Sequence, residues 1–231
     1  MTDQIQTIVA SVPSSVTVIA VTKTFPFEIV QRVYKVGLRH FGENRVTEAE
    51  EKIFLARQDK MHDIVWHMIG HVQRNKAKEV AQLFDWVDSV DGIDLSRALD
   101  REAGTRGKKL HVLLEVNISG ESTKSGFDVA GWEKQTSKRD QFLAVVSVVM
   151  KLPNIILDGL MTMPPYVMNA ENNRRIFQSM KKLSAFIQTQ VSNFGSELSM
   201  GTSCDYSVAI EEGATQVRLG EALFGKRLVV R

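Results

Sequence analysis

The sequence contains very little cysteine and no long apolar segment. Cys204 is the only cysteine in 231 residues, which excludes an intramolecular disulfide framework and indicates a reducing compartment. No apolar run approaches the roughly 20 residues that a membrane-spanning helix needs. The first residues lack the basic region and the apolar stretch of a signal peptide. We therefore expect a soluble, cytoplasmic protein that does not insert into membranes.

The sequence also lacks an excess of charge and a recognisable metal motif. Its 29 basic and 27 acidic residues leave a formal charge of +2, which gives no reason to expect a nucleic-acid or anionic-membrane partner. Three of the five histidines fall within residues 62–71, but without a paired spacing on a predicted helix or an acidic third ligand. No metal site is predicted. Because no linker or solenoid-length repeat divides the chain, we expect a single domain over residues 1–231.

Short β-branched apolar runs alternate with amphipathic stretches along the chain. Eight runs are predicted as strands, at residues 17–22, 38–41, 64–69, 86–90, 110–117, 155–161, 197–200 and 215–220. The stretches between them predict helices, at residues 28–37, 45–57, 75–84, 94–104, 128–149, 174–190 and 205–213. Eight alternating units indicate an α/β protein with a closed (β/α)₈ barrel of the TIM type. An open doubly wound sheet is the alternative, although no glycine-rich dinucleotide motif follows the first run.

Functional residues of such a barrel lie at the C-terminal ends of its strands. Lys23 follows the first strand, so its amine is expected among apolar walls at the barrel mouth, a setting that suits Schiff-base formation. The alternative is a lysine that extends to solvent. Position alone also selects Asn44 after the second strand and Met161 at the end of the sixth.

Two loops near the C-terminus combine glycine with small hydroxyl groups. The first contains Ser199, Gly201, Thr202 and Ser203, and the second contains Gly220 and Glu221. Barrels often bind phosphate at the loops after strands seven and eight, where backbone N–H groups and hydroxyls approach the anion. Taken singly, Gly220 could simply end a strand and Asp205 could cap a helix. Together, the two loops favour a phosphate site.

Arg218 precedes Gly220 by two residues and therefore lies on the same face of the last strand. Because a guanidinium stays charged, an arginine directed into a barrel needs an acceptor. A ring nitrogen or a ligand carboxylate would serve, and a structural ion pair with Glu43 or Glu115 is the alternative. Cys204 beside the first loop is either a packing residue or an exposed thiol.

Six segments together resemble the pyridoxal phosphate homeostasis protein family, whose barrel is like the N-terminal domain of alanine racemase. They are AVTKTFP (20–26), HFGENRVTEAEEK (40–52), WHMIGHVQRNKAKEV (66–80), EVNISGESTKSGF (115–127), LDGLMTMPP (157–165) and LSMGTSCDYSVAIEEGATQVRLGEALFGKR (198–227). They cover nearly the whole chain in order. The segment before the first strand is shorter than expected for this family, so the barrel floor is expected to be less covered. Thr202 and Cys204 also depart from the family pattern.

The resemblance implies a role for each residue of the site. Lys23 would hold pyridoxal 5′-phosphate as an aldimine, Asn44 would lie near the cofactor ring, and Arg218 would face the pyridine nitrogen. The loop from Ser199 to Ser203, with Gly220 and Glu221, would hold the phosphate. Ser203 is preferred over Ser199 as the phosphate ligand because it lies at the boundary between loop and helix.

The resemblance further implies a non-catalytic carrier that stores and delivers the cofactor, with cofactor-free enzymes as recipients. We expect a monomer or a weak dimer. The alternative is an amino-acid racemase, which needs a second acid–base group beside Lys23. In alanine racemase this group is a tyrosine from another domain, and none of Tyr34, Tyr166 and Tyr206 is an obvious substitute. A regulator whose protein partner senses the cofactor is a third possibility.

Overall fold

The computed structural model describes residues 2–225. Residue 1 and residues 226–231 lie outside the described residues, although the single-domain prediction includes them. Lys226 and Arg227, at the end of the last matching segment, are among these residues.

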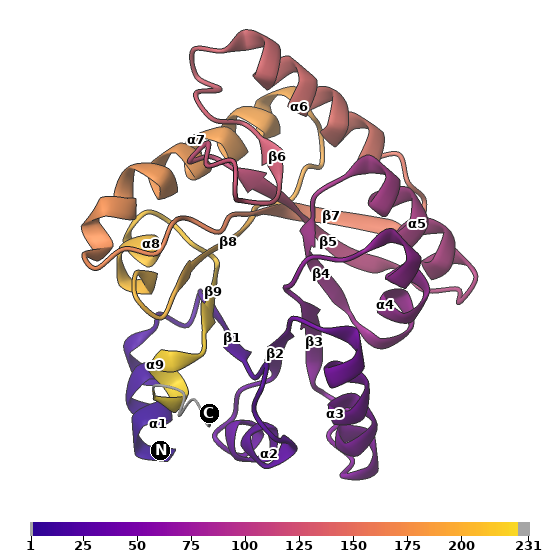
Figure 1. The fold of residues 1–231 in the computed structure, drawn as a ribbon, viewed down its shortest axis with the longest axis vertical. Coiled ribbons are helices and arrows are strands. Elements are labelled where there is room, and N and C mark those ends of the chain that lie inside the picture. The colour runs from indigo at the N-terminus through magenta and orange to yellow at the C-terminus, as the bar shows by residue number, and fades with distance from the viewer. Residues whose placement is uncertain (1, 226–231) are drawn as a thin grey trace.

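Eight parallel strands close into a barrel (Figure 1). They are β1 (Thr17–Val21), β2 (His40–Glu43), β3 (Val65–Met68), β4 (Trp86–Val90), β5 (Leu110–Asn117), β7 (Ile155–Met161), β8 (Glu197–Thr202) and β9 (Gln216–Leu219). Each pairs with its neighbours in chain order, β1 pairs with β9, and the pairing of β4 with β5 completes the ring. The predicted (β/α)₈ barrel is confirmed, and the ring excludes the open sheet.

Helices connect successive strands and cover the outside of the barrel (Figure 1). They are α1 (Thr2–Ser11), α2 (Phe27–Lys35), α3 (Val46–Gln58), η1 (Arg74–Lys76), α4 (Ala77–Leu83), α5 (Ile93–Gly104), α6 (Thr136–Val149), η2 (Ala170–Asn173), α7 (Arg174–Gln190), α8 (Tyr206–Glu211) and α9 (Glu221–Phe224). Each longer helix buries one apolar face against the strands, as α2 does with Ile29, Val30 and Val33. None of the helices in the described part of the chain is long and apolar enough to cross a membrane.

The structure corrects the bounds of several predicted elements, and β2, for example, ends at Glu43 rather than at residue 41. The helix predicted from residue 128 begins only at Thr136, and Phe127–Asp128 forms a short strand, β6, beside β5. Gly131, with φ +69°, lies in the turn between them and interrupts a helix there. Strand β8 runs to Thr202, two residues beyond its predicted end.

The segment before the first strand was expected to leave the barrel floor less covered, which stays a prediction. It forms the ten-residue helix α1, which lies beside α9 (Figure 1). Ile5 is fully buried, and the amide of Gln4 donates to the carbonyl of Ala222 at 2.8 Å. Helix α1 therefore packs against the C-terminal element that follows the last strand.

Candidate functional site

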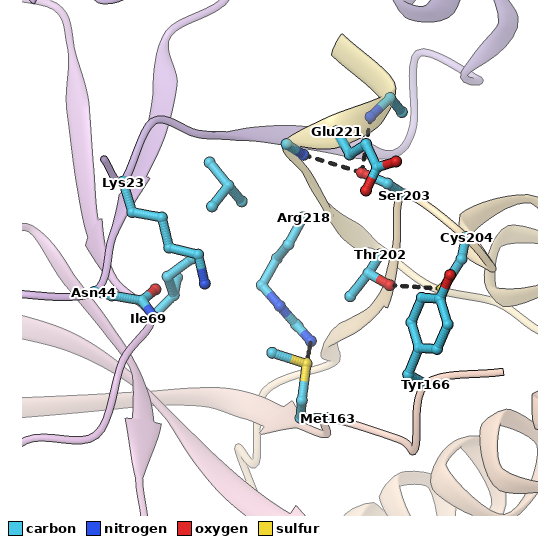
Figure 2. Close-up of a pocket in the computed structure, with 13 residues that line it drawn as sticks. Lys23, Asn44, Ile69, Met163, Tyr166, Thr202, Ser203, Cys204, Arg218 and Glu221 are labelled. Atoms are coloured by element: carbon cyan, nitrogen blue, oxygen red, sulfur yellow. Dashed lines mark hydrogen bonds between the residues drawn. The ribbon is translucent and has the colours of Figure 1, made fainter. Parts of the chain in front are cut away.

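A pocket of about 510 Å³ opens at the C-terminal ends of the strands (Figure 2). Its lining comes from the loops after β1, β2, β3, β7, β8 and β9: Val21, Lys23, Asn44, Ile69, Met163, Tyr166, Thr202, Ser203, Cys204, Arg218, Gly220, Glu221 and Ala222. The volume falls in the range of small-molecule sites. Segments from both ends of the chain therefore converge on one concave site.

Seven of the ten residues predicted for the site line this pocket. They are Lys23, Asn44, Thr202, Ser203, Arg218, Gly220 and Glu221. Figure 2 shows Lys23 extending beside Asn44 on one side of the pocket, with Arg218 between it and the loop of Thr202 and Ser203. The fold thus brings residues that are far apart in the sequence together in one cluster.

The other three predicted residues lie outside the lining. Met161 is buried in β7 with 1% of its surface exposed, where it packs rather than faces the pocket. Gly201 has φ +91°, and a Cβ there would lie 2.6 Å from the Cβ of Ala209. Gly201 therefore shapes the loop by allowing α8 to approach closely. Ser199 is fully buried and binds Arg218.

Arg218 is 3% exposed and is held by a residue of β8 and by the backbone just after β7. Its Nη1 donates to Ser199 Oγ at 2.7 Å and its Nη2 to the carbonyl of Thr162 at 2.8 Å, whereas its buried Nε has no acceptor within residues 2–225. Burial lowers the pKa of Arg218, and the charge of Asp88 is the first to oppose this shift. The guanidinium is thus fixed in place with a donor to spare.

The structural ion pair considered for Arg218 does not form. No carboxylate of residues 2–225 forms a salt bridge with it. Glu43 instead binds Lys52 at 2.8 Å, and Glu115 is buried on β5 with its pKa raised, first by burial and then by Asp91. Arg218 therefore places a positive charge inside the barrel. The carboxylates of residues 2–225 act on this charge from a distance and form no salt bridge with it.

Ser203 joins the two C-terminal loops. Its Oγ accepts hydrogen bonds from the backbone N–H of Gly220 at 3.2 Å and of Ala222 at 3.0 Å (Figure 2). With both lone pairs engaged, the hydroxyl proton remains available to an acceptor in the pocket. This arrangement makes Ser203 a suitable donor to an anion.

Asp205 occupies the N-cap position of α8, as the sequence had suggested it could, but its side chain stabilises the preceding loop and forms no capping hydrogen bond. Its Oδ1 accepts from the backbone N–H of Thr202 at 2.7 Å and from the Thr202 hydroxyl at 3.0 Å. Its Oδ2 accepts from Asn173 at 2.8 Å. The carboxylate turns back toward β8 and so fixes the conformation of the loop that carries Ser203.

Asn44 reaches the pocket beside a glycine, Gly70, that follows β3 by two residues. A Cβ on Gly70 would lie 2.4 Å from the carbonyl oxygen of Asn44, which no larger residue could accommodate without a shift of the backbone. The loops after β2 and β3 can therefore pack directly on each other. This close approach explains the glycine at residue 70.

Sequence reasoning missed six lining residues, namely Val21, Ile69, Met163, Tyr166, Cys204 and Ala222. Tyr166 and Met163 come from the Met-Pro-Pro loop after β7, and Tyr166 is 79% exposed at the pocket mouth. The position of Met163 and Tyr166 just after a strand end was the signal in the sequence that could have identified them as site residues. Cys204 is exposed, with its Sγ 3.3 Å from the Thr202 hydroxyl, so the thiol faces solvent rather than the core. No cluster of potential metal ligands occurs among the described residues.

The family model for the alanine racemase N-terminal domain matches residues 1–227. The chain belongs to this family. Within it, the chain is similar to the pyridoxal phosphate homeostasis proteins of Vibrio alginolyticus, with 37% identity over 93% of the chain and 88% of the relative, and of Synechocystis, with 37% identity over 96% of both. The resemblance found in the sequence is confirmed.

Solved structures agree with this assignment. The structure of PipY from Synechococcus elongatus with PLP bound covers 97% of this chain, with a TM-score of 0.86 and 33% identity. Alanine racemase from Clostridium difficile has a TM-score of 0.74 at 14% identity and matches over 59% of its own length. The second similarity establishes the shared barrel fold alone.

Proposed function

We propose that this protein binds pyridoxal phosphate in the pocket, attached to Lys23, and acts in its intracellular storage and delivery. The observation that carries the proposal is the convergence of Lys23, Arg218 and Ser203 on one pocket. Relatives of similar length are named pyridoxal phosphate homeostasis proteins, and PipY was solved with PLP bound. These similarities support the same ligand here.

The residues present fit the chemistry of this cofactor. Ser203 can donate its hydroxyl to the phosphate, and the buried Nε of Arg218, which has no acceptor within residues 2–225, can serve a ring nitrogen or another acceptor. When bound, pyridoxal phosphate supplies an aldehyde that reacts with an amine and a ring that withdraws electrons. Lys23 supplies the amine, and Asn44 lies beside it at the ring end of the pocket.

Arg218 favours a carrier over a catalyst. A guanidinium can only donate hydrogen bonds and stays charged at ordinary pH. A pyridine nitrogen that accepts from it therefore remains unprotonated, which weakens the electron withdrawal on which amino-acid chemistry depends. Residues that hold the cofactor firmly and activate it weakly suit storage and transfer to cofactor-free enzymes, or a racemase that tolerates weak electron withdrawal.

The racemase alternative is favoured by one observation, which is that Tyr166 lines the pocket. Racemisation needs a second acid–base group opposite Lys23, and a phenol could serve. Its 79% exposure places the side chain mostly in solvent, outside the buried setting typical of such a group. Alanine racemisation that is abolished by Tyr166→Phe would establish this alternative, and turnover that is absent in the unmodified protein would exclude it.

The proposal is tested by the absorption spectrum of the purified protein before and after borohydride reduction. We expect a visible band that reduction removes, and a reduced cofactor that mass spectrometry maps to Lys23. Transfer is measured by adding the loaded protein to a cofactor-free enzyme and following the recovery of that enzyme's activity. Reduced cofactor on another lysine near the pocket, such as Lys124, would refute the assignment of Lys23.

A further inference from the structure

A buried cluster of charged side chains lies directly behind the loop that carries Lys23. It consists of Glu43 at the end of β2 and of Glu48 and Lys52 on α3, and we call it the Lys52 cluster. Lys52 Nζ lies 2.8 Å from Glu43 Oε1 and 2.7 Å from Glu48 Oε1. The side chains of Lys52 and Glu43 are 5% and 0% exposed. All three residues belong to the segment HFGENRVTEAEEK, of which the proposed cofactor site uses only Asn44.

The cluster binds the backbone on both sides of Lys23. On the preceding side, Lys52 Nζ donates to the carbonyl of Thr22 at 2.7 Å, and the Thr22 hydroxyl donates to Glu43 Oε1 at 2.6 Å. On the following side, the backbone N–H of Thr24 donates to Glu48 Oε1. Thr24 has φ +65°, a conformation that β-branched residues rarely adopt. The loop is therefore fixed in a specific and otherwise unfavourable shape.

Stability alone is a poor explanation for this arrangement. Removing the charges of Lys52 and Glu43 from water carries a desolvation cost, and an apolar replacement of similar volume often serves a protein core equally well. Burial is the largest influence on Glu43 and raises its pKa, against the opposing effects of Lys52 and Thr22. The side chains of the cluster form hydrogen bonds with Thr22 and Thr24, the two residues on either side of Lys23. The geometry of the cluster therefore serves the residue between them.

We propose that Glu43, Glu48 and Lys52 are positioning residues for Lys23, which fix the strand end so that its amine enters the pocket in one orientation. The inference rests on the proposed function, because the orientation matters for reaction with the cofactor aldehyde. An amine held near the attack geometry reacts far faster than one on a mobile loop. Supporting groups of this kind decide whether a reactive side chain is held closely enough to react.

Two substitutions test the proposal from opposite ends of the cluster. Lys52→Met removes the ammonium that joins the two glutamates to Thr22, and Glu48→Ala removes the acceptor of the Thr24 N–H while the Lys52–Glu43 pair remains. Glu48→Gln retains a carbonyl oxygen at the same place and serves as the conservative variant. Lys108→Met is the matched control, because Lys108 is also a partly buried lysine that donates to a carbonyl, that of Phe84 at 2.7 Å, away from the pocket.

The first measurement is the rate at which pyridoxal phosphate becomes attached to Lys23, trapped with borohydride and quantified by mass spectrometry. We expect Lys52→Met and Glu48→Ala to slow attachment by roughly 10- to 100-fold. Glu48→Gln and Lys108→Met should react at nearly the wild-type rate. Amide hydrogen exchange of the cofactor-free protein should show faster exchange at Thr24 in Glu48→Ala only, since Glu48→Gln keeps the acceptor.

The proposal is overturned if cofactor attaches to Glu48→Ala at the wild-type rate. It is also overturned if the attachment rates of the variants merely follow their thermal unfolding midpoints, so that Lys108→Met is slowed as much as Glu48→Ala. If Lys52→Met does not fold, the Glu48 pair of variants decides the matter. If wild-type protein attaches no cofactor at Lys23, the proposed function fails. The positioning role is then tested with trinitrobenzenesulfonate, an amine reagent, and an unchanged Lys23 labelling rate in Glu48→Ala would refute it.

Discussion

Ser199 holds Arg218 from the neighbouring strand, since Arg218 Nη1 donates to Ser199 Oγ at 2.7 Å and both side chains are buried. This contact shows that the two serines of the SMGTS segment (residues 199–203) have different surroundings. Ser199 lies on β8 and faces the guanidinium, whereas Ser203 lies beyond the strand and lines the pocket. Ser203 therefore stays the predicted phosphate ligand, and Ser199 has a different role, which is to hold Arg218.

Substitution of the two serines should therefore affect two ligands differently. We expect Ser203→Ala to weaken binding of pyridoxal phosphate by roughly 10- to 100-fold, the loss of one hydrogen bond to a charged group. Binding of pyridoxal, which has no phosphate, should not change. Ser199→Ala should weaken both ligands equally by loosening Arg218. Equilibrium titration with each ligand measures this, and an equal effect of Ser203→Ala on both would contradict it.

Lys23→Ala should abolish covalent attachment without eliminating binding. Ser203 and Arg218 remain in place in this variant, so pyridoxal phosphate should still bind reversibly. Borohydride reduction followed by intact-mass measurement should show no added cofactor, whereas the wild-type protein gains one. Lys124→Ala is the matched control, because Lys124 lies within reach of the loop after β7 and donates to Pro164 at 3.4 Å. Retained attachment in Lys23→Ala would disprove the assignment.

Substitution of Arg218 should change both affinity and chemistry. Arg218→Ala removes the donor and should loosen the cofactor, as measured by its dissociation rate. Arg218→Glu places a carboxylate there, which favours a protonated ring nitrogen and hence stronger electron withdrawal. We expect this variant to acquire slow transamination or racemisation that the wild-type protein lacks, measured by chiral chromatography after incubation with alanine. Brisk turnover by the wild-type protein would contradict the carrier proposal.

His40 should make the protein sensitive to mild acid. Burial, followed by the charge of His67, lowers the pKa of His40 from its ordinary value of 6.5 to about 4. Between these values the unfolded chain binds more protons than the folded one, so stability falls as pH drops from 6.5 toward 4. His40→Gln should reduce this loss of stability, because it removes the titrating imidazole. The glutamine keeps a polar group beside His67, whose Nε2 lies 2.9 Å from Nδ1 of His40.

Chemical denaturation at pH 7 and pH 5 measures this effect. The exposed His62 supplies the control variant His62→Gln, which should behave as the wild-type protein does. An equal loss of stability in all three proteins between the two pH values would show that His40 is not the responsible group.

The sequence predicted the barrel well because a parallel sheet buried on both faces leaves a clear local pattern. Each predicted strand of the ring is present, because its apolar residues and its flanking turn residues are local properties. The start of α6 was predicted wrongly, since residues 128–135 are polar and helix-like in composition but contain Gly131 in a left-handed turn. Local propensity could not reveal β6, whose two residues depend on pairing with β5.

The sequence by itself determined the fold class, the family and most of the residues that line the pocket, because strand ends in a closed barrel share one face. Only the tertiary structure decided the partners of these residues. Whether Arg218 meets Glu43, Glu115 or Ser199 depends on which side chains face each other across the barrel, and spacing along the chain does not encode this. The same holds for Lys52, whose contacts with Thr22 and Glu43 join a helix to two strand ends 30 and 9 residues away.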